Sequence, residues 1–225
     1  MTSHEYPLYN AYIWEYIASP WVSWEPSSST LLYAPFTNDL VDHSPSSTTM
    51  TKNGTVTNTT LNWVKCAYFN GWYIDVNLYT QTNVTHTISL WFYTTTNNDS
   101  WWIICSNPCW IMQWEAIAPN SSTIRYLSFW SEWWITASWS YTWQWFNVIL
   151  TWWKMYVNNT YIWEKTTAPN WASYKYSICN HASWSSCSRR VRYWYVWEVI
   201  IENVVWSDEI RNAYYNQTKW NYWIS

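Results

Sequence analysis

The chain has 225 residues, a length that fits one sizeable β-sandwich or barrel domain. Only 11% of the residues are charged and the formal net charge is −3, so no basic surplus favours nucleic acid as a partner. The apolar runs are only a few residues long, whereas a membrane-spanning helix needs about 20, so no membrane span is expected. The first residues lack a basic segment and a continuous apolar core, so no ordinary signal peptide is expected either.

Residues 1–29 are irregular and rich in proline and serine, and they are predicted to be an arm or linker before one domain at 30–225. The first strand is predicted at 31–36, followed by a polar loop. CAYFNGWYIDVNL (66–78) is predicted to be a hairpin about Asn70-Gly71, because Asn-Gly favours a tight turn.

HTISLWFYT (86–94) alternates strictly, with Ile88 and Phe92 on one face and Trp91 and Tyr93 on the other. Turn signals recur every 8–12 residues, which is typical of a sandwich. One helix is predicted from Ser207, a suitable N-cap, to 215. Further strands are predicted at 102–105, 110–117, 123–129, 133–138, 144–150, 154–158, 160–165, 174–179 and 191–203.

QWFNVIL and KMYVNN (144–159) predict a second hairpin, but the loop between them contains Trp152 and Trp153. A tight turn favours Gly, Asn or Asp there, because its central residues adopt positive φ. The same anomaly marks the composition, which has 26 Trp and 2 Gly. Average usage of about 7% Gly would give roughly 16 glycines.

Two interpretations of these tryptophans are open. In one, the protein is rich in Trp and stacks its rings on sugars. In the other, which we favour, many positions are glycine, written as Trp because a reassigned UGA codon was read with another code. A bulky residue in the left-handed region costs about 1–2 kcal/mol, so some twenty such positions would exceed the whole stability of a domain.

The five cysteines allow two loop-closing disulfides, Cys105–Cys109 and Cys179–Cys187, which would leave Cys66 over. Free thiols are an equally open alternative. A zinc site is the least favoured, because neither spacing is a CxxC knuckle.

With Trp read as Gly at turns, residues 31–217 resemble the laminin-G-like branch of the concanavalin A-like lectin/glucanase superfamily. The resemblance rests on LLYAPFTNDLVDHS, CAYFNGWYIDV, HTISLWFYT, YTWQWFNVILTWWKMYVNNTYIWE and VRYWYVWEVIIENVVWSDEIRNAYYN, in that order. It implies an all-β, antiparallel jelly roll of two packed sheets with one short C-terminal helix. It also implies that Trp91, packed inside the sandwich, and Trp145 are true tryptophans, whereas Trp152, Trp153 and Trp163 fall on glycines.

Members of that family often hold a structural calcium ion near their closing strand. The carboxylates that match these loops are Asp39, Asp42 and Glu198, and oxygen ligands suit Ca²⁺. Where the family often has an Asp, this chain has Trp197, which weakens the calcium prediction. Solvated loop acids are the alternative.

Glycosidases of this fold use closely spaced carboxylates, and the nearest pair is Glu198 and Glu202. The central acid between them is missing, so a glycan hydrolase is the least favoured function. A sugar site needs a stacking ring beside amide or carboxylate groups. We expect one at Tyr93, Asn97, Asn98 and Asp99.

Arg189 and Arg190 form a basic cluster that fits an acidic sugar, or lie in a solvated turn. The sequence therefore predicts a non-enzymatic, lectin-like recognition or adhesion module for a glycan or glycoprotein, exposed outside the cell, on a cell surface or on a virion. The alternative is a structural decoration or fibre protein that self-associates through residues 1–29.

Overall fold

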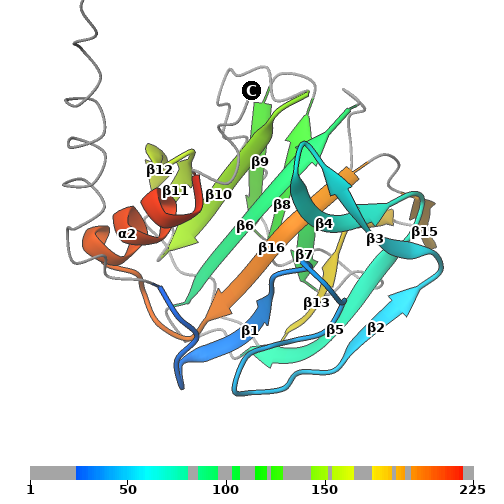
Figure 1. Cartoon of the computed structure of the whole chain (residues 1–225), viewed down its shortest axis with the longest axis horizontal. Coiled ribbons are helices and arrows are strands. Elements are labelled where there is room, and N and C mark those ends of the chain that lie inside the picture. Colours follow the sequence, from blue (N-terminus) through cyan, green and yellow to red (C-terminus); the bar gives the residue numbers. More distant parts are fainter. Residues whose placement is uncertain are drawn as a thin grey trace, which may run out of the picture.

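The computed structural model describes residues 24–80, 86–95, 103–106, 115–120, 123–128, 143–151, 154–164, 174–183, 186–190 and 194–219. Strands and one helix account for most of them (Figure 1). Their bounds are β1 (Thr30–Ala34), β2 (Met50–Asn53), β3 (Val56–Leu61), β4 (Val64–Phe69), β5 (Tyr73–Thr80), β6 (Thr87–Thr94), β7 (Ile104–Ser106), β8 (Glu115–Asn120), β9 (Thr123–Ser128), β10 (Trp145–Thr151), β11 (Lys154–Val157), β12 (Thr160–Glu164), β13 (Tyr174–Ile178), β14 (Asn180–Ser183), β15 (Ser186–Arg190), β16 (Trp194–Glu202) and α2 (Asp208–Lys219).

Within the described ranges these strands form two large antiparallel sheets and one separate pair. The larger sheet has eight strands in the order β12-β11-β10-β6-β16-β4-β3, with β1 also pairing with β16. The smaller sheet has six strands in the order β2-β5-β13-β7-β8-β9, and β14 pairs with β15. The predicted fold class, an antiparallel two-sheet sandwich with a C-terminal helix, is confirmed.

The two sheets pack face to face around one apolar core. On β6, Ile88 and Phe92 join this core together with Ile74 and Tyr176 of the smaller sheet. The other face of β6 carries Trp91 and Tyr93, which belong to a second cluster on the outside of the larger sheet, so the predicted alternation is confirmed. The expectation that Trp91 packs between the sheets is wrong, because it lies on the outer face, where α2 covers it.

The predicted hairpin at 66–78 is also wrong. β4 pairs with β3 and β16 in the larger sheet, whereas β5 pairs with β2 and β13 in the smaller one. Gly71 does reverse the chain, with a φ of 84°. Because β4 and β5 both turn apolar residues towards the core, including Phe69 and Ile74, the reversal crosses from one sheet to the other.

The hairpin of β10 and β11 is confirmed, with register from Val148 opposite Val157 to Thr151 opposite Lys154. Trp152 and Trp153 lie outside the described residues. The following turn has φ of 47° at Asn158 and 64° at Asn159, which Asn tolerates better than most residues, and leads into β12.

Two further findings revise the N-terminal half. β2 lies where a polar loop was expected, and β3 lies where no strand was predicted. Both are edge strands with mostly exposed polar side chains. Trp24 packs its ring 5.1 Å from that of Tyr33 and 5.9 Å from that of Tyr214. The packed domain therefore extends back to at least Trp24, although the boundary was predicted at 30.

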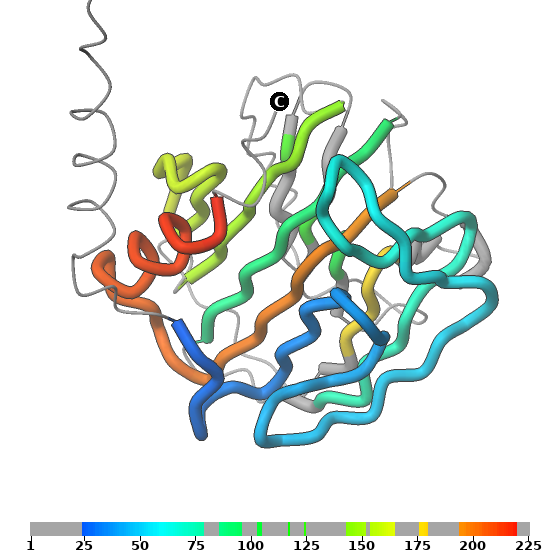
Figure 2. The backbone as a smooth tube through the Cα atoms, in the orientation of Figure 1, coloured from blue at the N-terminus to red at the C-terminus, as the bar shows by residue number. Residues whose placement is uncertain are grey.

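Helix α2 lies across one end of the larger sheet, beside β10, β11 and β12 (Figures 1 and 2). Its N-cap is confirmed, because the Ile210 amide donates to the Ser207 hydroxyl oxygen at 3.3 Å, but the helix continues beyond 215 to Lys219. No helix in the described ranges is long and apolar enough to cross a membrane.

Candidate binding surface

The outer face of the larger sheet carries a second apolar cluster, which α2 covers at one end. The rings of Trp91 and Tyr215 stack there nearly in parallel, with centroids 5.9 Å apart. Trp206, just before α2, packs 5.0 Å from Tyr214. The helix therefore buries apolar side chains that the sheet would otherwise present to water.

The tip of the β3–β4 hairpin covers another part of this face. β4 pairs with β16 only from Ala67 to Phe69, and the earlier residue Val64 joins the outer cluster. At the tip, the Asn62 side chain is hydrogen-bonded to Tyr93 of β6. The hairpin therefore curls across β16, and Figure 2 shows this curve in cyan.

Between α2 and this hairpin, one row of aromatic side chains runs across four strands. The registers place Tyr68 of β4 opposite Tyr195 of β16, Tyr195 opposite Tyr93 of β6, and Tyr93 opposite Trp145 of β10. Opposite residues point to the same face. The ring centroids are 4.8, 5.9 and 5.7 Å apart in that order. This aromatic row spans three strand spacings, roughly 14 Å.

The aromatic row is not equally open along its length. Tyr68 and Tyr195 are half-buried, whereas Tyr93 is 5% exposed and Trp145 is 8% exposed. Burial raises the pKa of both Tyr93 and Tyr195, with the proximity of Tyr68 adding to the effect on Tyr195. Both phenols are therefore neutral at pH 7 and keep a hydroxyl group that can donate and accept hydrogen bonds.

Charge is sparse on this face. The outward positions of β3, β4, β6 and β10 hold uncharged residues, and the two acids of β16, Glu198 and Glu202, are buried. Lys65 of β4 alternates away from this face and donates to the Asn38 side chain at 3.0 Å. Thr57 lies opposite Tyr68 with an exposed side chain, so the open end of the aromatic row has a hydroxyl beside it.

The structure changes the sugar site predicted from the sequence. Tyr93 belongs to the aromatic row but is too buried to act as the exposed stacking ring, because β10 and β16 flank it and Asn62 covers it. Its predicted companions Asn97, Asn98 and Asp99 lie outside the described residues. Arg189 and Arg190 lie on β15, opposite His181 and Asn180, and their side chains are outside the description.

The three proposed calcium ligands are not brought together. Both carboxylate oxygens of Asp42 accept hydrogen bonds, from the Tyr33 amide of β1 and, within its own loop, from the amides of Ser44 and Thr48 and the Ser44 hydroxyl. Asp39 pairs with His43 at 2.8 Å. Across the described ranges, no group of three or more His, Cys, Asp or Glu side chains is placed to hold a metal ion.

The carboxylate pair considered for hydrolysis is inaccessible. Glu198 is 3% exposed and Glu202 is 4% exposed. Glu202 accepts hydrogen bonds from the Thr30 hydroxyl at 2.9 Å and from the Trp206 indole N–H. A substrate cannot reach either acid in this arrangement.

The thiol of Cys66 is unpaired and fully buried on β4, and burial raises its pKa to about 12. Cys179 is buried, and its amide donates to the Ile103 carbonyl at 2.7 Å. The side chains of Cys105 and Cys187, and the whole of Cys109, lie outside the description, so both proposed disulfides stay predictions.

Sequence reasoning missed Tyr68 and Tyr195. Each alternates with core residues on its own strand, a pattern visible in the sequence. Their pairing depends on the register between β4 and β16, which are separated by more than a hundred residues and which no local signal aligns.

The strand order, the two packed sheets and the C-terminal helix define a concanavalin A-like jelly roll. No protein-family model matches the sequence, and no curated protein is similar to it in sequence. Solved structures do share the fold. The binding domain of botulinum neurotoxin serotype D has 17% identity and a TM-score of 0.66 over 84% of this chain and 52% of that one.

Two other similar structures carry information on partners. A structure of botulinum neurotoxin type C, whose cell entry is described as dependent on interaction with two ganglioside molecules, has 16% identity and a TM-score of 0.63. The binding domain of botulinum neurotoxin DC in complex with rat synaptotagmin II has 15% identity and a TM-score of 0.63. The match covers 84% of this chain and 51% of each of these two, so the chain spans about half the length of the structures that it resembles.

Proposed function

We propose that the chain is a non-enzymatic carbohydrate-binding recognition module that binds an uncharged glycan at the open end of the aromatic row. One observation carries this proposal: Tyr68 and Tyr195 form a stacked, half-buried pair on an uncharged sheet face. Aromatic rings of this kind pack against the apolar face of a sugar. Display on a cell surface or virion is part of the same proposal.

The surroundings of the pair supply polar partners. Thr57 offers a hydroxyl group opposite Tyr68, and the hairpin tip offers the Asn62 amide near Tyr93. Because the described outward positions around the pair carry no exposed charge, an acidic sugar would lose hydration without gaining a partner. An uncharged ligand avoids that cost.

The similar structures support the proposal at the level of the fold. Two of them are described as binding domains, one of these in complex with rat synaptotagmin II, and the third belongs to a toxin whose cell entry is described as dependent on two ganglioside molecules. A shared fold does not transfer a ligand, so the glycan class assigned to this chain depends on the tyrosine pair.

A glycan array with the full chain tests the proposal, followed by titration of the best ligand. Tyr68→Ala and Tyr195→Ala should each weaken binding about tenfold, equivalent to about 1.4 kcal/mol. Tyr161→Ala is the matched control, because Tyr161 is 52% exposed on β12, away from the aromatic row. Equal losses in all three variants, or none, would contradict the site.

Salt dependence tests the charge of the ligand separately. Binding of an uncharged glycan should change little between low and high ionic strength, because no ion pair is screened. Binding restricted to sialylated glycans and weakened by salt would refute the uncharged class while leaving a glycan-binding function in place.

Self-association through residues 1–29 is a second candidate. The Trp24 amide donates to the Gln217 side chain of α2 at 2.8 Å, so the segment leading into β1 is fixed beside the helix. Gel filtration of the full chain against residues 24–225 tests this candidate without removing the packed ring. Loss of self-association in the shorter chain would favour assembly.

A further inference from the structure

A buried carboxyl group joins three elements beneath α2. Glu198 lies on β16 and is 3% exposed. It accepts a hydrogen bond from the Tyr214 hydroxyl of α2 and another from the Tyr33 hydroxyl of β1. The helix, the edge strand β1 and the central strand β16 therefore meet at one carboxyl group.

The surrounding groups do not balance a negative charge. The titratable neighbour on β1 is Tyr33, whose pKa is also raised by the charge of Glu25 in the segment before β1. The titratable neighbour on α2 is Tyr214. From β6, Ser89 is hydrogen-bonded to Tyr214. The second acid of β16, Glu202, is bonded to Thr30 and Trp206. These neighbours are either acidic or neutral at pH 7.

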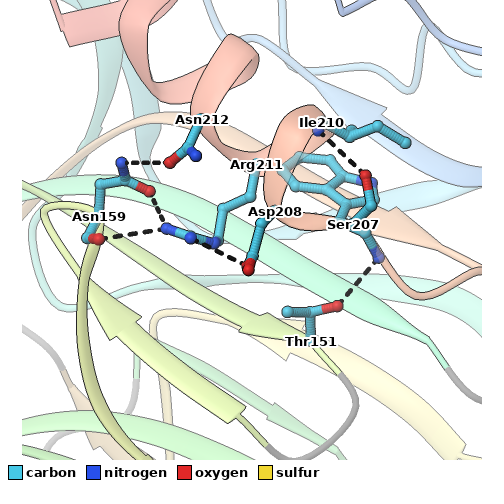
Figure 3. A network of polar contacts seen from close by, with 8 residues as sticks. Thr151, Asn159, Ser207, Asp208, Ile210, Arg211 and Asn212 are labelled. Carbon is cyan, nitrogen blue, oxygen red and sulfur yellow. Dashed lines mark hydrogen bonds and ion pairs between the residues drawn. The ribbon is translucent and has the colours of Figure 1, made fainter.

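The basic groups of α2 within the described residues are directed to other partners. Arg211 donates to the backbone carbonyl and side chain of Asn159 and to Asp208 (Figure 3). Its guanidinium lies 3.9 Å from the ring centroid of Tyr156. Lys219 lies 5.8 Å from the ring centroid of Tyr215. Among the described residues, Glu198 therefore has hydrogen-bond donors but no cation beside it.

Burial makes the ionised form of such a carboxyl costly. Desolvation raises the pKa of Glu198 from 4.5 to about 7, although the hydrogen bonds from Tyr214 and Tyr33 oppose the shift. The protonated carboxyl is the form that suits this site.

We propose that the contact between α2 and the larger sheet is a pH-sensitive latch: the helix is held on the sheet while Glu198 is protonated and loosens when Glu198 ionises. The start of the helix has anchors of its own, the Arg211 contacts and the Trp206 amide, which donates to the Thr151 hydroxyl at 3.0 Å (Figure 3). The loosening therefore concerns the part from Tyr214 onwards. It would bare Trp91, on which Tyr215 stacks.

The direction of the pH effect follows from proton linkage. Between pH 4.5 and about 7 the folded state holds a proton on Glu198 that the open or unfolded state has lost. The closed state is therefore most favoured below pH 4.5 and loses stability as the pH rises towards 7. With a pKa of 4.5 in the open state and about 7 in the closed state, the opening constant becomes roughly 300-fold larger once the pH is well above 7.

Hydrogen exchange of the backbone amides from 214 to 219 measures the opening directly. After correction for the intrinsic pH dependence of exchange, protection in the unaltered protein should fall by up to roughly 70-fold between pH 5 and 8. Glu198→Gln keeps a buried hydrogen-bonding side chain without the charge, so its protection should stay level across this range.

Glu202→Gln is the matched control, because Glu202 is an equally buried acid on the same strand, and it should leave the pH dependence in place. If Glu198→Gln does not fold, Tyr214→Phe provides a second test. It removes a donor that favours the ionised carboxyl, so the loss of protection should move to higher pH. A pH-dependent loss that persists in Glu198→Gln, or that does not move in Tyr214→Phe, would overturn the latch.

Discussion

Replacing Trp63 by glycine should stabilise the protein, although the change removes a whole tryptophan side chain. Trp63 follows Asn62 in the turn between β3 and β4, with a φ of 67°, and its side chain is 85% exposed. The left-handed backbone costs a bulky residue about 1–2 kcal/mol. Glycine removes this strain but adds about 0.4–1 kcal/mol of chain entropy to the unfolded state. The net gain is about 1 kcal/mol, because the exposed ring contributes little burial.

Trp143 allows the same test at a second site, with a φ of 67° and an exposure of 68%. Urea unfolding of Trp63→Gly and Trp143→Gly should each show a midpoint above that of the unaltered chain at constant slope. Trp145→Gly is the control, because this ring is buried against Tyr93 and its loss should cost about 3–5 kcal/mol. Lower midpoints for both turn variants would refute the strain argument.

The same two positions test our hypothesis that some of the tryptophans are glycine in the native protein. If a reassigned UGA codon specifies glycine, peptide sequencing of the protein from its source should find glycine at 63 and 143. Tryptophan at both sites would refute the hypothesis there, and the strain would then be a real property of the two turns.

Three further predictions follow from single sites. Asp42→Ala should lower the free energy of unfolding by about 2–4 kcal/mol, because the N–H and O–H groups that donate to its carboxylate would lose their acceptor. An unchanged urea midpoint would contradict this. Cys66 should resist alkylation at pH 8 in the folded protein and react in urea, because burial raises its pKa to about 12. Peptide mapping by mass spectrometry measures the modification, and alkylation of Cys66 without urea would contradict the prediction. Gly54→Ala should lower the free energy of unfolding by at least about 1 kcal/mol, because φ is +82° and the new Cβ would lie 1.8 Å from the Trp72 ring. Urea unfolding measures this, and an unchanged midpoint would show that the turn can relax.

Local periodicity predicted the strands well but not their partners. The alternation of β6 is a property of eight consecutive residues, so it is legible in the sequence. The sequence around Asn70 and Gly71 signals a reversal just as clearly. Whether the two strands then pair or cross between sheets depends on β3, β16 and β13, which are distant in the chain.

Which face of a strand lies inside was harder still to predict. All eight residues of β6 are buried, because the core covers one face and the outer cluster beneath α2 covers the other. When both faces of a strand are buried, the sequence does not show whether a Trp points to the core between the sheets or to the outer cluster. The family resemblance placed Trp91 between the sheets, which is why the prediction failed. β2 and β3 present the opposite difficulty, because edge strands with exposed Thr, Asn and Lys are locally indistinguishable from a polar loop.

Glu198 shows why the chemistry of a residue cannot be taken from a motif alone. In the sequence it is a calcium-ligand candidate or one acid of a hydrolase pair, and both roles require a carboxyl group that the ion or the substrate can reach. The helix that begins ten residues later folds back over it and supplies the Tyr214 hydroxyl but no positive charge. Burial then closes the carboxyl group to a substrate, and the neutral acid that burial favours is a poor ligand for calcium. For as long as α2 stays closed, the proposed latch holds the helix on the sheet, and the proposed ligand site is the half-buried pair of Tyr68 and Tyr195 on the same face.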